Sequence, residues 1–200
     1  PNFLEGNDER ILTVCDVSGS METQIDTSGT TAMDVSVSMG LYFSERLNGP
    51  FKDAWITFSD RPKLKYLKGD LFARAQSLVT DRDWSGSTNL EGVLNLILSK
   101  AKAGSVPAED MPTKILIFSD MEFNYCTRNP SVGFYFQMIK EQYAEAGYAM
   151  PDIVFWNLNG RIGNVPAQTE QKNAALLSGF SPATVKAVLG GEILTPMKAM

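Results

Sequence analysis

The stretch ILTVCDVSGS, Ile11–Ser20, joins a short apolar run to a tight turn. The apolar part, Ile11–Cys15, lacks the polar alternation of a half-exposed strand and is typical of a parallel strand covered on both faces. The turn brings together the carboxylate of Asp16 and the hydroxyls of Ser18 and Ser20, because alternate residues of a turn converge and the intervening glycine lets the backbone bend. This oxygen-only set suits a hard divalent cation such as Mg²⁺.

Three further apolar runs resemble the first, and longer helical segments lie between them. This alternation predicts an α/β fold: a doubly wound, mostly parallel central sheet of about six strands, with right-handed crossovers and helices on both faces. The expected parallel strands are Ile11–Cys15, Ala54–Phe58, Ile115–Phe118 and Ile153–Trp156.

Two lesser strands are expected at the margins of the sheet. Lys63–Leu67 follows a turn so closely that it should pair antiparallel as an edge strand, and Ala174–Leu177 should form the opposite edge. Helices are expected over Thr31–Leu47, Leu71–Val79, Leu90–Ala103, Val132–Ala146 and Ser181–Leu189.

Composition limits what the chain can do. Its 200 residues, 44% of them hydrophobic, fit one domain over residues 1–200, and a start at Pro1 is compatible with excision from a longer protein. The net charge of −5 argues against a nonspecific nucleic-acid surface, and no apolar run reaches the roughly 18 residues of a membrane span. The chain has no histidine, so Ser/His and Cys/His catalysis are excluded. With Cys15 and Cys126 expected as free thiols, we expect a cytoplasmic protein.

More oxygen ligands follow other strands. The pair Ser119-Asp120 comes directly after Ile115–Phe118, and Thr88 lies in the small polar loop before the Leu90 helix. Ligands of doubly wound sheets bind at the carboxyl ends of the strands, where Asp16 also lies. Two carboxylates balance one divalent cation, and an incompletely filled coordination shell can accept an anionic oxygen from a partner. The alternatives are ordinary turn and capping chemistry, or a site that keeps the residues but binds metal poorly.

These residues resemble the metal-ion-dependent adhesion site of von Willebrand factor A domains, with all five motif positions in order. The resemblance implies that Ser18, Ser20 and Thr88 bind the metal through hydroxyls, that Asp16 and Asp120 bind it directly or through water, and that a partner's Asp or Glu completes the shell. The chain also resembles the A-domain half of a family catalogued as a domain of unknown function. The strings that carry this second resemblance are SDMEF (119–123), Gly147-Tyr148, PDIVFWNL (151–158) and LLSGFS (176–181).

Other polar residues permit two interpretations each. Asp60 is a turn residue or supports the metal site from outside, and Glu122 is a solvated residue or adds charge beside the metal. The alternating Lys63, Lys65 and Lys68 protect an edge strand from aggregation, with a nucleic-acid patch as the less favoured interpretation.

The sequence favours a binding protein without catalytic activity. We expect a divalent-metal-dependent protein-interaction module that binds a partner's carboxylate through Mg²⁺, with Mn²⁺ or Ca²⁺ as alternatives. The metal ligands would be Asp16, Ser18, Ser20, Thr88 and Asp120. The chain is expected to be monomeric, with no membrane and no direct nucleic-acid contact. The alternative functions are a Mg²⁺-dependent phosphoesterase and a scaffold domain of an RNA-associated protein.

Overall fold

The computed structural model describes residues 9–16, 18–47, 49–59, 61–80, 89–120, 131–158 and 174–178. The expected helix Ser181–Leu189 lies outside them. None of the described helices is both long and apolar enough to cross a membrane.

The described strands form one six-stranded sheet in the order β3-β2-β1-β4-β5-β6. Five strands run parallel, and β3 pairs antiparallel with β2 at one edge. The predicted fold class is therefore confirmed, and so are the two edge strands. The strands are β1 Ile11–Cys15, β2 Ala54–Thr57, β3 Leu64–Tyr66, β4 Lys114–Ser119, β5 Asp152–Asn157 and β6 Ala174–Ser178.

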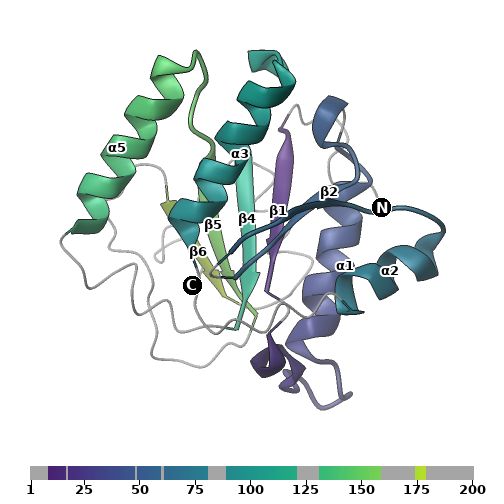
Figure 1. Cartoon of the computed structure of the whole chain (residues 1–200). Helices are drawn as coiled ribbons and strands as arrows, with labels where there is room; N and C mark the ends of the chain where they lie inside the picture. The colour runs from purple at the N-terminus through teal and green to yellow at the C-terminus, as the bar shows by residue number, and fades with distance from the viewer. Residues whose placement is uncertain are drawn as a thin grey trace.

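Helices cover both faces of the sheet. Helices α1 and α2 lie on one side and α3 and α5 on the other (Figure 1). The helices are α1 Ala32–Ser44, α2 Leu71–Thr80, α3 Leu90–Gly104 and α5 Ser131–Glu145, with short 3₁₀ turns η1 Gly19–Glu22, η2 Gly49–Phe51 and η3 Ala108–Asp110.

Successive strand residues belong to two different cores. Leu12 and Val14 of β1 pack in the core on the α3 side, whereas Ile11 and Cys15 pack in the core on the α1 side. Both sets are buried, which is why the central strands are apolar without alternation. This double cover leaves the carboxyl ends of the strands as the place where polar side chains gather.

Helix α1 begins where its sequence predicts and packs close to β1. Thr31 caps it, accepting a hydrogen bond from the backbone N–H of Asp34 while the Asp34 carboxylate accepts one from the Thr31 N–H. A side chain at Gly40 would place its Cβ 2.9 Å from the Cys15 Sγ, so only glycine allows this approach. The helix therefore holds β1, and the turn that follows it, firmly in place.

The ends of α2 and α5 lie within one residue of the prediction, and two other helix ends differ for a reason that the structure shows. Helix α1 stops at Ser44 rather than Leu47, because Leu47 leaves the helix to pack in the core on the opposite, α3 side of the sheet. Helix α3 includes Gly104 and ends at Ser105, which adopts the left-handed conformation (φ 47°) expected of the glycine.

Candidate functional site

The carboxyl ends of β1 and β4 lie side by side. Cys15 pairs with Phe118, and beyond this last pair the Asp16 N–H donates to the Phe118 carbonyl at 2.9 Å. On the other side of β4, the Leu158 N–H donates to the Ser119 carbonyl at 3.0 Å. The parallel register thus brings Asp16 and the Ser119-Asp120 pair to the same end of the sheet, as predicted.

Asp16 is a buried carboxylate held by neutral donors. Asp16 is 1% exposed. Oδ1 accepts a hydrogen bond from the Ser18 N–H at 2.9 Å, and Oδ2 accepts one from the Ser119 hydroxyl at 2.6 Å. None of the ion pairs seen among the described residues includes Asp16. A buried carboxylate without a cation is costly, so this arrangement favours a positively charged ligand.

The remaining oxygens form a chain from the β1 turn to the end of β4. The Ser18 and Ser20 hydroxyls lie 3.0 Å apart, and the Ser20 hydroxyl donates to Asp120 Oδ1 at 3.1 Å. Ser18 stands at the N-cap of η1, yet its side chain makes no capping hydrogen bond. Capping therefore does not account for the Ser18 hydroxyl, although the Asp16–Ser18 bond is an ordinary turn interaction.

Four of the five predicted ligands are thus brought together, and the fifth, Thr88, lies outside the described residues. The next residue, Asn89, caps α3 by accepting from the Gly92 N–H at 2.7 Å. The Asn89 N–H donates to the Ser59 carbonyl at 3.2 Å, at the carboxyl end of β2. The chain therefore enters α3 beside the strand end that neighbours β1.

Three residues near the site are not among the five predicted ligands. Ser119 orients Asp16, and the Met21 Sδ accepts a hydrogen bond from the Asp120 N–H at 3.1 Å. Ser59 is 1% exposed, and its hydroxyl has no hydrogen-bond partner among the described residues. The positions of Ser59 and Ser119 directly after apolar runs were a usable signal, whereas nothing in the sequence marks a thioether as an acceptor.

The described residues contain no group of three or more His, Cys, Asp or Glu side chains suited to a metal ion. The oxygens gathered here come from two carboxylates and two hydroxyls, which is a donor set for a hard cation such as Mg²⁺ rather than for zinc. Asp60 and Glu122 lie outside the described residues.

Cys15 lies next to Asp16 but is poorly suited to nucleophilic chemistry. Burial raises the pKa of its thiol to about 12, and hydrogen bonding to Ser36 and Thr13 offsets this only in part. The thiol is free, and at neutral pH it stays protonated. Cys15 therefore acts as a core residue behind the site.

A second turn repeats the spacing of the first. The Asp26 Oδ1 accepts hydrogen bonds from the N–H groups of Ser28 and Thr30, both at 2.9 Å, and from the Ser28 hydroxyl at 2.8 Å. The Ser28 and Thr30 hydroxyls lie 2.9 Å apart. These bonds, from Ser28 first and then Thr30, lower the pKa of Asp26. The pentapeptide pattern alone therefore does not define a site.

The sheet order and the helices on both faces define an α/β fold like that of von Willebrand factor A domains. A von Willebrand factor type A structure from Catenulispora acidiphila matches 90% of this chain and 41% of its own, with a TM-score of 0.53 and 14% identity. The RO (RSR) protein of Deinococcus radiodurans matches 93% of this chain and 35% of its own, with a TM-score of 0.60 and 19% identity. At these identities the likeness concerns the fold.

The chain belongs to the family described as Domain of unknown function (DUF7788), whose model matches residues 10–199. It is also 30% identical, over 196 residues, to the uncharacterized protein L728 of Acanthamoeba polyphaga mimivirus. That match covers 98% of this chain but 33% of the viral protein, so the chain spans about a third of its relative's length.

Proposed function

We propose that the protein is a divalent-metal-dependent interaction module, in which Asp16, Ser18, Ser20, Thr88 and Asp120 hold a Mg²⁺ ion that binds a carboxylate of a protein partner. One observation carries the proposal: Asp16 is buried and makes no ion pair within the described part of the chain, and it lies at a strand end where two hydroxyls and a second carboxylate converge. The von Willebrand factor A-like fold supports it, because in doubly wound sheets ligands bind at this end of the strands.

Each side chain has a separate task in this proposal. Ser119 and the Ser18 N–H fix the orientation of the Asp16 carboxylate through one hydrogen bond to each oxygen. Met21 fixes the backbone at Asp120 with a soft sulfur acceptor, which does not compete for a hard ion. The bound ion would supply two positive charges to balance the two aspartates and one position for a partner's oxygen.

We propose binding without catalysis. The chain has no histidine, and the thiol of Cys15, next to Asp16, is held protonated by burial. A phosphoesterase would need a group that activates water or a nucleophile beside the metal. We therefore expect no turnover of p-nitrophenyl phosphate with Mg²⁺ or Mn²⁺, and measurable turnover that Asp16→Ala abolishes would replace the binding proposal with the hydrolase alternative.

Calorimetric titration with MgCl₂ tests the metal site. Wild type should bind one ion, and Thr88→Ala and Asp120→Asn should each weaken binding at least about tenfold, since loss of a ligand leaves a small ion poorly coordinated. Lys100→Ala, on the exposed end of α3, is the matched control. Equal Mg²⁺ binding by wild type and both ligand variants would refute the assignment.

The partner's role is tested by affinity capture with Mg²⁺ or with EDTA. A partner of the metal site should be captured by wild type with Mg²⁺ and lost with EDTA and with Thr88→Ala. Partners that remain bound under all three conditions would show that the interaction does not use the metal.

A further inference from the structure

The edge strand β3 offers unpaired backbone groups. The Leu67 N–H donates to the Asp53 carbonyl at 2.8 Å and the Thr57 N–H to the Lys63 carbonyl at 3.1 Å, so the odd-numbered residues of this segment face β2. In an antiparallel pair, the backbone N–H and C=O groups of the intervening residues point away from the partner strand. The N–H and C=O groups of Leu64 and Tyr66 therefore point outward, and no described residue hydrogen-bonds to them.

Exposed apolar side chains flank this edge on both faces. Tyr66 is 48% exposed and lies on the same face as Leu64, which packs against the core on the α3 side. On the other face, α2 begins with Leu71 and Phe72, which are 65% and 75% exposed. A strand whose only task is to block aggregation would not be flanked by large apolar side chains.

The edge is also strongly basic in an acidic protein. Residues 61–68 contain Arg61, Lys63, Lys65 and Lys68 and no acidic residue, although the chain carries a net charge of −5. This local excess repels a second copy of the same edge and attracts a negatively charged segment.

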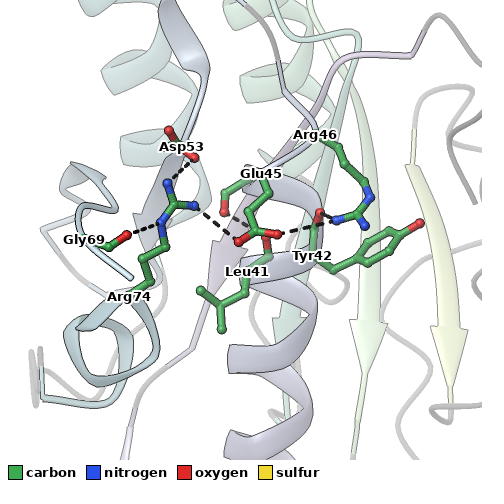
Figure 2. A network of polar contacts seen from close by, with 8 residues as sticks. Leu41, Tyr42, Glu45, Arg46, Asp53, Gly69 and Arg74 are labelled. Atoms are coloured by element: carbon green, nitrogen blue, oxygen red, sulfur yellow. Dashed lines mark hydrogen bonds and ion pairs between the residues drawn. The ribbon is translucent and has the colours of Figure 1, made fainter. Parts of the chain in front are cut away.

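Two acidic side chains close to this segment, those of Asp53 and Glu45, form ion pairs with Arg74 (Figure 2). Arg74 of α2 binds Asp53 Oδ1 at 2.9 Å and Glu45 Oε1 at 3.4 Å, and its Nε donates to the Gly69 carbonyl at 3.2 Å. These contacts tie α2 to α1 and to the turn before β2. Asp53 and Glu45 are therefore already matched by a positive charge.

We propose that the β3 edge is a docking site for an extended protein segment that alternates acidic and apolar residues. The segment pairs with the outward backbone groups of Leu64 and Tyr66 and extends the sheet by one strand. Its apolar side chains cover Tyr66 on one face or Leu71 and Phe72 on the other, and its acidic side chains lie against the basic residues. The docking site is separate from the carboxyl ends of β1 and β4 and needs no metal.

The test uses a fluorescent, end-blocked peptide of roughly eight alternating valines and glutamates, a usual strand length, with binding followed by anisotropy in EDTA. The expected result is saturable binding that the double substitution Lys63→Glu/Lys68→Glu weakens at least about tenfold. Lys100→Glu/Lys102→Glu, a matched charge reversal at the end of α3, should leave binding unchanged.

Three altered peptides, two of them N-methylated, separate strand pairing from charge attraction without risk to the protein's folding. One of these peptides is N-methylated at its odd-numbered residues and another at its even-numbered residues, so that each cannot donate hydrogen bonds along one of its two edges. The peptide that is methylated along the edge facing β3 should bind at least about fivefold more weakly than the parent peptide. A Val/Lys peptide should not bind. Equal binding of the parent peptide and of both N-methylated peptides would refute strand addition.

Two further outcomes would also overturn the proposal. One is unchanged peptide binding by Leu71→Ser/Phe72→Ser together with Tyr66→Ser, because the apolar flanks would then play no part. The other is that a uridine oligonucleotide binds in the same assay and displaces the peptide at lower concentration, which would identify the edge as a nucleic-acid surface. Because all measurements are made in EDTA, failure here leaves the metal-site proposal untouched.

Discussion

The turns Asp16–Ser20 and Asp26–Thr30 share a spacing and a hydrogen-bonding scheme but not a setting. In each, the aspartate accepts from the N–H two residues on, at 2.9 Å, and the two hydroxyls that follow lie within hydrogen-bonding distance. Asp16, however, ends a central strand, whereas Asp26 lies in an exposed turn.

The setting gives the first turn properties that the second lacks. Asp16 is enclosed beside β4, where Ser119 binds it and Asp120 supplies a second carboxylate. Asp26 satisfies its oxygen from its own turn, through Ser28 and Thr30. A local pattern therefore specifies a turn, and a metal site requires in addition the side chains that another strand brings.

The two turns should differ most when each aspartate is replaced by alanine, in Asp16→Ala and Asp26→Ala. The first change should abolish Mg²⁺ binding and lower the free energy of unfolding by about 2 kcal/mol, because it leaves the Ser119 hydroxyl and the Ser18 N–H without their buried acceptor. The second should leave Mg²⁺ binding unaltered. Calorimetry and urea unfolding measure both, and equal loss of Mg²⁺ binding in the two variants would remove the distinction.

Asp16→Asn separates the charge of this residue from its hydrogen bonds. The amide can accept from the Ser18 N–H and donate to the Ser119 hydroxyl, so stability in EDTA should stay within about 1 kcal/mol of wild type. Mg²⁺ binding should still fall at least about tenfold, because one of the two balancing charges is gone. Retained Mg²⁺ affinity would show that the Asp16 charge is not what attracts the ion.

Ser20→Ala and Thr30→Ala compare the last hydroxyl of each turn. Ser20 donates to Asp120 across 100 residues of sequence, so Ser20→Ala should weaken Mg²⁺ binding about tenfold, as expected for the loss of one ligand. Thr30 bonds within its own turn, so Thr30→Ala should bind Mg²⁺ like wild type. A titration of both variants under the same conditions would contradict this if Thr30→Ala were the weaker.

The smallest expected effect is a pH effect at Asp26. Its pKa is lowered from 3.8 in the folded chain, so its contribution to stability is present above about pH 3.8 and is lost as the pH falls through the folded pKa. Ser28→Ala removes the leading cause and should move the pKa of Asp26 back towards 3.8. A ¹³C titration of the side-chain carboxyl would contradict this if the two proteins titrated alike.

Much of this structure could be predicted because the signals were local. Short apolar runs marked the strands to within one residue at each end, and Asp16 and Asp120 directly follow strands β1 and β4. Two features could not be predicted: the packing of Leu47 in the core on the α3 side, and the hydrogen bond that the Met21 sulfur accepts. Both depend on packing between distant segments. The second turn at Asp26 shows the same limit, since its sequence resembles the first, and only burial and the side chains at the end of β4 distinguish them.

The contact between Ser20 and Asp120 has a consequence for the order of events in folding. It joins residues 100 positions apart, and it forms only after β1 and β4 have aligned. Such long-range contacts are costly to close, so an ion held there would bind late, once most of the sheet exists. Mg²⁺ should therefore lengthen the lifetime of the folded chain by slowing its unfolding, and leave the rate of its formation almost unaltered.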